Sequence, residues 1–325
     1  MNTSSAPPGA GCPACGRSID ADRAFCPHCG ARTGRRSAVY ALLIGVLARI
    51  LHVAAFRHRT LSLTLLAVVL GAAVYLWSSQ RAADPWVRCL ATIDDSARTA
   101  EALQFCARAA ADNPGLASAH TALAVLYRRQ GDEPRAMLET ERALAIDPAE
   151  PLALKMRCYL LNGGDTPRYV EAVAVCARAA EVDSDGASVH LNNQAWALAR
   201  LGRCAEALPV VQQSLGLESG QHATLNTMAY IQVCLGQYPG ALQTIAAIVP
   251  QQDLDAWDHM VRAAARVGLN QFDLALADIA TATSIDPAET RREVAANGWF
   301  APLRATPARA ALLDRALETP PRAKA

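Results

Sequence analysis

The chain has 325 residues, enough for two or three folded units, and 52% of them are hydrophobic while only 5% are aromatic. An Ala-rich, aromatic-poor composition favours closely packed helices over β-sandwiches. The formal net charge of +1 provides no overall attraction to nucleic acid or to an acidic partner. The first thirty residues contain no apolar core, so we do not expect a cleavable secretory signal.

Residues 1–11 are small and polar, and we expect them to be disordered. Two Cys-x2-Cys pairs, separated by ten residues, follow within residues 12–30. Their thiolates, Cys12, Cys15, Cys26 and Cys29, supply the four-sulfur tetrahedral set that suits zinc. Two CPxCG pairs so close together disfavour a disulfide framework. Because four protein ligands close the site, we predict a structural zinc ion that supplies the folding energy of this small segment.

This segment closely resembles the short zinc-ribbon domain found at the N-terminus of bacterial membrane proteins, including Phe25 directly before the second pair. The resemblance implies the fold and the metal but little about function. Some zinc ribbons bind nucleic acid, and nearby arginines could contact phosphates. Arg35 and Arg36 are better explained as basic residues flanking a membrane segment, so we do not expect nucleic-acid binding.

Two apolar stretches follow the cysteines. Arg49 and His52 interrupt the first, residues 37–58, which we interpret as an amphipathic helix in the membrane interface, with a second membrane span as the alternative. The second stretch, within residues 60–78, includes the uncharged run Leu61–Trp77. At about 1.5 Å per residue it spans roughly 25 Å, so we predict a transmembrane helix.

Flanking charges orient the predicted span. Arg57, His58 and Arg59 precede it, and the far side carries little charge. The positive-inside bias therefore places the N-terminal side in the cytoplasm. We expect a single-pass protein of the bacterial inner membrane with a cytoplasmic zinc ribbon and a periplasmic C-terminal part.

Residues 83–290 contain an internal repeat. Pro114 and Pro148 are 34 residues apart, as are Gly202 and Gly236. This period, with a midway Gly and a terminal Pro, resembles the tetratricopeptide repeat, in which each unit is a helix, a turn and a second helix. We place six units near 83–116, 117–150, 152–186, 188–221, 222–255 and 256–289. The last unit departs from the pattern with Asn270 where Gly is usual.

The predicted fold class is therefore all-α: a tetratricopeptide-repeat solenoid preceded by a transmembrane helix and a zinc ribbon. Residues 291–318 suggest a capping helix over the open end of the array, with Trp299 and Phe300 beneath it. Residues 319–325 are a tail that we expect to be frayed.

Six further cysteines follow the apolar stretch. In repeat coordinates, the first two pairs occupy positions that face each other between the helices of one unit, and the third pair joins neighbouring units. The candidate disulfides are Cys89–Cys106, Cys158–Cys176 and Cys204–Cys234. Three bridgeable pairs indicate an oxidising compartment. Small apolar core cysteines that replace alanine are the alternative.

Resemblance to the repeat family implies a concave groove lined by the first helices. The groove-facing candidates by family position are Thr121, Val125, Arg128, Asn192, Trp196, Arg200, Asn226, Tyr230 and Trp257. Asn side chains can bond the backbone of an extended peptide, and Trp and Tyr offer amphipathic contact area. Any solvated helix face also carries polar residues, so each candidate has a purely structural alternative.

No phosphate-binding loop, GxSxG or HExxH motif occurs, so we do not expect an enzyme. The favoured function is a membrane-anchored scaffold whose periplasmic repeat array binds protein or peptide partners. The alternative is a transmembrane regulator whose zinc ribbon contacts nucleic acid or a cytoplasmic partner.

Overall fold

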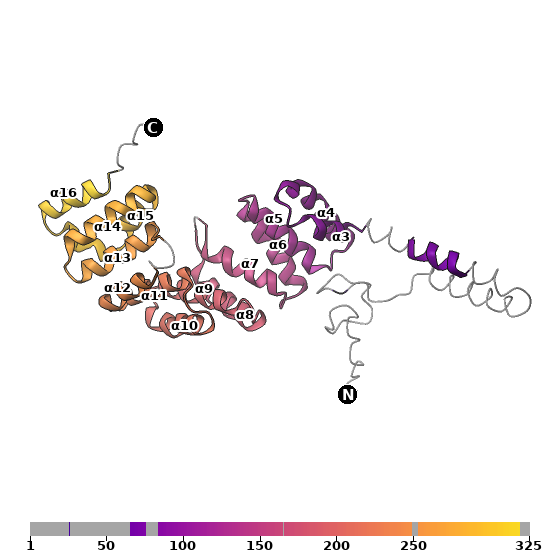
Figure 1. Ribbon diagram of the computed structural model, residues 1–325, viewed down its shortest axis with the longest axis horizontal. Helices are drawn as coiled ribbons and strands as arrows, with labels where there is room; N and C mark the ends of the chain where they lie inside the picture. The colour runs from indigo at the N-terminus through magenta and orange to yellow at the C-terminus, as the bar shows by residue number, and fades with distance from the viewer. Residues whose placement is uncertain (1–25, 27–65, 76–83, 165, 249–252, 319–325) are drawn as a thin grey trace, which may run out of the picture. The chain divides into compact units, whose positions relative to one another are not determined.

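The computed structural model describes residues 26, 66–75, 84–164, 166–248 and 253–318, and the regular secondary structure within these ranges is helical (Figure 1). It divides into two compact units, residues 1–156 and 157–325, which are considered separately below. The zinc ligands Cys12, Cys15 and Cys29 and the predicted helix at 37–58 lie outside the described residues. So do the tails at 1–11 and 319–325.

Six helix pairs follow one another in the described part of the chain. The first helices are α3 (Pro85–Thr92), α5 (Ala117–Arg129), α7 (Pro151–Asn162), α9 (Ala187–Arg200), α11 (His222–Cys234) and α13 (Ala256–Gly268). The second helices are α4 (Thr99–Asp112), α6 (Glu133–Ile146), α8 (Tyr169–Val182), α10 (Cys204–Leu217), α12 (Tyr238–Ile248) and α14 (Phe272–Ile285). The all-helical repeat is therefore confirmed, and the six pairs match the six predicted units, except that α7 and α9 each begin one residue before the predicted start.

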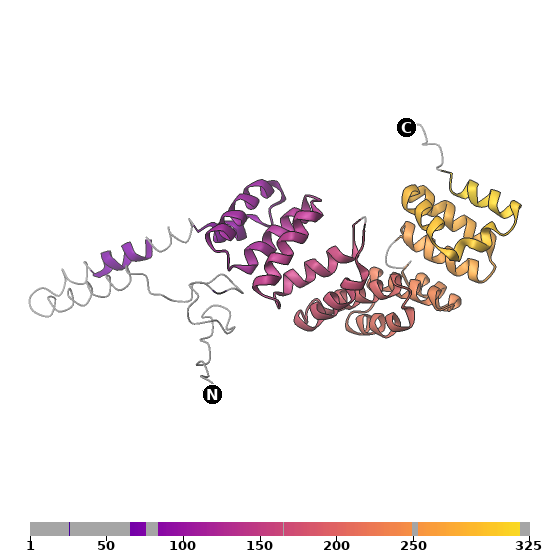
Figure 2. The same ribbon diagram turned by 180° about the vertical axis from the view of Figure 1, so that it is seen from behind.

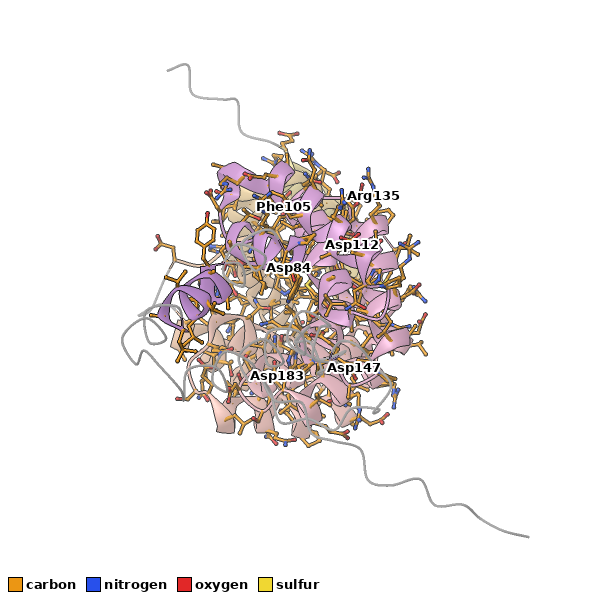
Figure 3. The ribbon with its side chains drawn as sticks, turned by 90° about the vertical axis from the view of Figure 1, so that its right-hand side faces the viewer. Asp84, Phe105, Asp112, Arg135, Asp147 and Asp183 are labelled. Carbon is orange, nitrogen blue, oxygen red and sulfur yellow. A yellow bond between two sulfur atoms is a disulfide. The ribbon has the colours of Figure 1, made fainter. Side chains whose placement is uncertain are left out.

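The unit formed by residues 1–156 has a core of small side chains. Cys89, Ala102, Cys106 and Ala119 are fully buried where α3, α4 and α5 pack together. Asp84, which is labelled in Figure 3, caps the N-terminus of α3. Its carboxylate accepts a hydrogen bond from the Trp86 amide at 2.9 Å. Small residues at these contacts let the helices approach closely, as the Ala-rich composition predicts.

The unit formed by residues 157–325 contains the larger core. The first helices α9, α11 and α13 contact one another in sequence, and each contacts its second helix (Figure 2). Buried side chains of this core include Val211, Ile231, Ile245 and Ile279. The neighbouring first helices therefore form one layer of this unit, and the residues at matching repeat positions share its surface.

The C-terminal part differs from the single predicted capping helix. It consists of α15 (Pro287–Ala296), the 3-10 segment η2 (Gly298–Arg304) and α16 (Pro307–Ala316). Asn297, in an extended conformation, ends α15, and prolines inside η2 and at the start of α16 prevent one continuous helix. Phe300 is buried as expected, but Trp299 instead packs against the repeat helices.

The predicted membrane span is described only over residues 66–75, which are helical. Their apolar side chains are open to the surroundings: Val68 is 68% exposed and Val74 is 62% exposed. Within the described ranges, no helix has both the length and the apolar character that crossing a membrane requires.

Glycines at the turns between paired helices adopt the left-handed backbone conformation. The φ angles are 76° at Gly131, 75° at Gly202 and 73° at Gly236. Asn270 holds the same place in the last pair with a φ of 59°. Asn tolerates this region better than other residues with a side chain, so the departure from the glycine pattern preserves the turn.

Alanine substitution at two glycines should change stability in opposite directions. A Cβ at Gly236 or at Gly216 would meet no atom within 4 Å, so neither change creates a clash. We expect Gly236→Ala to lower the free energy of unfolding by about 1 kcal/mol because of its positive φ. Gly216→Ala, inside α10, should raise it by about 0.5 kcal/mol. Urea unfolding of both variants measures this, and changes of the same sign would contradict the backbone argument.

Candidate partner-binding face

The first helices of the larger unit place matching residues side by side. Trp196 on α9 and Tyr230 on α11 are 34 residues apart, as are Asn192 and Asn226. Since a constant repeat length keeps equivalent positions on the same side of successive helices, these residues share one surface. We call the surface formed by Asn192, Trp196, Arg200, Tyr230 and Trp257 the binding face.

Four aromatic rings meet at this surface. Trp196 lies 5.3 Å from Tyr230 and 5.4 Å from Trp257, measured between ring centroids. Tyr230 also packs on Trp257 at 5.8 Å and on Trp299 at 4.9 Å. The pairs are tilted, stacked or T-shaped, and the ring separations are favourable for aromatic contacts. We call Trp196, Tyr230, Trp257 and Trp299 the aromatic cluster.

Burial within the cluster affects the central phenol. Tyr230 is 6% exposed, and removal from water raises the pKa of its hydroxyl group, partly offset by the nearby Arg200 cation. Burial likewise raises the pKa of Tyr169, which lies on the first turn of α8. Both side chains therefore remain neutral near pH 7 and act as hydrogen-bonding aromatic surfaces and not as charges.

Arg200 brings a positive charge into the aromatic surroundings. Its guanidinium carbon lies 5.3 Å from the ring centre of Trp196 and 5.8 Å from those of Trp257 and Tyr169. Rings at this distance attract a cation through their negative faces. Arg200 also forms an ion pair with Glu293 at 3.5 Å. The binding face thus offers one cation that three rings hold in place.

Two polar atoms of the binding face have no hydrogen-bond partner among the described residues. They are the side-chain oxygen of Asn192, a residue only 7% exposed, and the indole nitrogen of Trp257. Both atoms are buried, and an unsatisfied buried polar group costs about 1–3 kcal/mol. Asn192 can accept a hydrogen bond and Trp257 can donate one.

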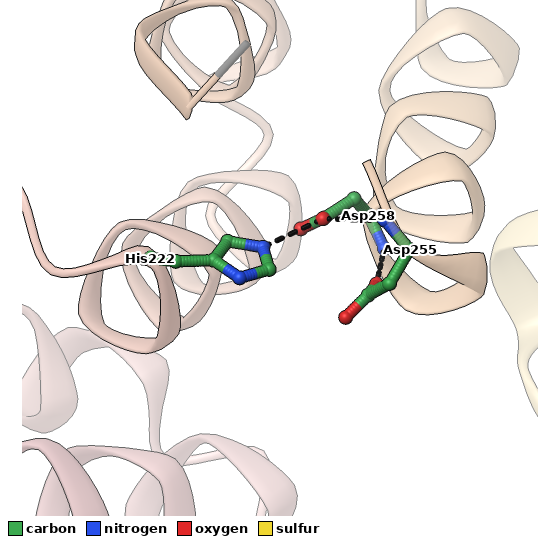
Figure 4. Close-up of side chains that lie close together, drawn as sticks. All are labelled: His222, Asp255 and Asp258. Carbon is green, nitrogen blue, oxygen red and sulfur yellow. Dashed lines mark hydrogen bonds and ion pairs between the residues drawn. The ribbon is translucent and has the colours of Figure 1, made fainter. Parts of the chain in front are cut away.

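Asn226 belongs to a different set of contacts, next to a cluster of described residues whose ligand atoms are close enough to hold a metal ion (Figure 4). It donates to the fully buried Asp258 carboxylate, which also accepts from His222 at 2.6 Å and from the Asp255 backbone at 3.0 Å. Asp255 in turn accepts from the Asp258 amide at 2.8 Å.

The ligand atoms of His222, Asp255 and Asp258 lie within 4.8 Å of one another. The two aspartates form a capping box at the start of α13. The contacts of Asp258 thus satisfy the helix end and tie α11 to α13. We therefore assign this cluster to the fold and not to metal binding.

The predicted groove residues fall in both compact units. Thr121, Val125 and Arg128 lie on α5 in the unit formed by residues 1–156, and the second unit contains Asn192, Trp196, Arg200, Asn226, Tyr230 and Trp257. Thr121 is buried and bonds Glu150. Of the predicted groove residues, Trp196, Arg200, Tyr230 and Trp257 come together in one place.

Sequence reasoning missed two residues at this surface. Glu293 and Trp299 come from the C-terminal part, outside the repeat pattern. Trp299 and Phe300 stand out in a chain with few aromatic residues, but no sequence pattern predicted that Trp299 packs against α11.

The six later cysteines form three disulfides in the structure, in the predicted pairing. Cys89 bonds Cys106, Cys158 bonds Cys176, and Cys204 bonds Cys234. The first joins α3 to α4, the second α7 to α8, and the third α10 to α11. Cys26, the only described member of the predicted zinc set, is buried.

Comparison with known proteins supports the fold. A tetratricopeptide repeat protein from Parabacteroides merdae has 14% identity and a TM-score of 0.54, with coverage of 74% of this chain and 100% of that protein. PilF of Pseudomonas aeruginosa has 20% identity and a TM-score of 0.50, with coverage of 70% and 98%. PilW, a type IV pilus biogenesis factor, has 16% identity and a TM-score of 0.50, with coverage of 67% and 95%.

No family model and no curated protein matches the sequence. At these low identities the structural likeness concerns the fold alone. The described helix pairs have the fold of tetratricopeptide-repeat proteins.

Proposed function

We propose that this chain is a membrane-anchored interaction scaffold whose repeat array binds protein or peptide partners through the binding face. The observation that carries the proposal is the aromatic cluster with Arg200 at its edge. Trp, Tyr and Arg are the residues that most often dominate binding energy in protein interfaces. Stacked helix pairs also present an extended surface that suits a peptide segment.

An exposed apolar helix supports the membrane anchor. Residues 66–75 carry Val68, Leu70 and Val74 with at least half of each side-chain surface exposed, and the uncharged run extends to residues 61–77. Leaving such surface in water is unfavourable by about 25 cal/mol per Å². A bilayer would cover it. A reporter fused after Gln80 tests whether the repeat array lies outside the cytoplasm.

The cysteine arrangement supports a periplasmic repeat array. All six cysteines that follow the apolar run are paired, and five of them are buried. Disulfides of this kind persist in oxidising compartments. The proposed topology keeps these pairs on the periplasmic side and the N-terminal cysteines in the reducing cytoplasm.

The N-terminal segment fits a structural zinc site by its donor set. Four thiolates in two Cys-x2-Cys pairs match the ligand number and type that zinc prefers, and Cys26 is buried as a closed site requires. Cys12, Cys15, Cys26 and Cys29 would hold the ion, which would stabilise the fold of the segment. Measuring bound zinc in the purified chain, with and without these four cysteines, tests the assignment.

Crosslinking in cells tests the proposed function. A photoreactive phenylalanine derivative at Trp196 retains an aromatic ring on the binding face. We expect it to capture one or a few defined proteins. The matched control carries the same group at Gln213, an exposed position on the second helix α10. Identical captures at both positions, or none at Trp196 in correctly localised protein, would refute binding through this face.

A further inference from the structure

The chain's own C-terminal segment already contacts the binding face. Glu293 on α15 pairs with Arg200 at 3.5 Å, and Trp299 in η2 packs on Tyr230 with ring centroids 4.9 Å apart. Neither residue belongs to one of the six helix pairs. The segment therefore supplies a carboxylate and an indole to the same groups that we propose for partner binding.

Other residues anchor this segment. Val294, Phe300 and Leu303 are between 0% and 1% exposed and belong to the core of the second unit. Glu293 and Trp299 are their immediate neighbours in sequence, but their side chains reach Arg200 and Tyr230 instead. These core contacts can hold the segment in place even when Glu293 or Trp299 loses its own contact. A partner could therefore replace either contact without unfolding the segment.

The chemistry of Arg200 indicates what a partner must provide. Its side chain retains 23% exposure and is fixed among three rings, whereas the Glu293 carboxylate is 6% exposed and also accepts from Asn297 at 2.8 Å. A guanidinium ion prefers a carboxylate, and bonds between charged groups are stronger than neutral ones. Next to it, the aromatic cluster provides a surface for a flat side chain.

We infer that the binding face recognises a peptide carrying a carboxylate and an aromatic side chain, and that Glu293 and Trp299 occupy these two places until such a peptide displaces them. The inference rests on the proposed function and specifies the partner's chemistry. The internal contacts then act as a competitor that lowers affinity for every outside ligand. Removing the competitor should therefore strengthen binding.

Fluorescence polarisation with the full-length protein in detergent micelles tests the competition. The probe is a labelled peptide that copies residues 289–301 and so contains both groups. We expect Glu293→Gln to bind it about tenfold more tightly than the unchanged protein, because Arg200 loses its internal partner. Trp299→Ala should also bind more tightly. The double variant Glu293→Gln, Arg200→Gln should bind the probe about tenfold more weakly than the single variant Glu293→Gln.

Two controls isolate the effect. Asp314→Asn removes one exposed negative charge from α16 and should leave probe affinity unchanged. A probe with its own Glu293→Gln and Trp299→Ala changes should not bind. Circular dichroism verifies that each variant is folded.

Equal affinity of the folded Glu293→Gln, Trp299→Ala and unchanged proteins for the probe would overturn the inference. Continued capture of partners at Trp196 in that case would leave the proposed function intact. If no partner is captured at Trp196, the proposed function is refuted, whatever the probe-binding experiment shows.

Discussion

Replacing Asp278 with asparagine is expected to lower the free energy of unfolding by about 3 kcal/mol. Asp278 on α14 is 3% exposed, and its carboxylate joins two arginines of α13. Arg262 donates from Nη2 at 2.7 Å and Arg266 from Nη1 at 2.7 Å. The substitution retains the shape of the side chain but leaves both cations without their anion.

The expected loss is at the lower end of the range for broken buried pairs, about 3–5 kcal/mol. The side chains of Arg262 and Arg266 retain 23% and 21% exposure, so water compensates part of the lost interaction. Urea unfolding followed by tryptophan fluorescence reports mainly on the second unit, because three of the five tryptophans, Trp196, Trp257 and Trp299, lie there.

Asp273→Asn is the matched control for this prediction. It makes the same charge change at an exposed position on the same helix, and should cost no more than about 0.5 kcal/mol. If Asp278→Asn costs as little as this control, the ion pairs do not hold α13 against α14. The stability of the last repeat would then come from apolar packing alone.

The repeat period explains which parts of the site could be predicted. The 34-residue spacing places Trp196 and Tyr230 at equivalent positions, and the first helices of the second unit bring them to a ring separation of 5.3 Å. The same spacing equates Asn192 with Asn226, yet Asn226 bonds Asp258. That difference arises from the capping box at the start of α13, which is a local feature and not part of the repeat.

Residues outside the repeat could not be placed in the same way. Glu293 on α15 pairs with Arg200 of α9, and Trp299 in η2, after the end of α15 at Ala296, packs on Tyr230 of α11. No period relates those residues to the helices they contact. Arg128 has a suitable repeat position too, on α5 in the unit formed by residues 1–156, and its place in a partner groove stays a prediction.

The three disulfides should contribute stability according to the length of chain that each one closes. Cys204–Cys234 has a sequence separation of 30, against 17 for Cys89–Cys106 and 18 for Cys158–Cys176. A cross-link restricts the unfolded chain more when it closes a longer loop. We expect the double variant Cys204→Ala, Cys234→Ala to lose about 2–4 kcal/mol of unfolding free energy.

Each of the shorter pairs should cost about 0.5 kcal/mol less than Cys204–Cys234 when replaced in the same way, because closure entropy rises slowly with loop length. Alanine is the suitable replacement because it leaves no hydroxyl group at these positions, five of which are buried. Urea unfolding of the full chain with and without dithiothreitol measures the effect. Reductant should destabilise the unchanged protein most and a variant lacking all six cysteines not at all.

The state of these cysteines also tests the topology, because disulfides persist only where the repeat array lies in an oxidising compartment. Protein isolated with its thiols blocked during lysis should yield the linked peptides 89–106, 158–176 and 204–234 by mass spectrometry. Six free thiols, together with unfolding that ignores reductant, would mean that these cysteines only fill small gaps between helices, as alanine does. The repeat array would then lose its main link to the periplasm, and the orientation of the predicted span would rest on the flanking charges alone.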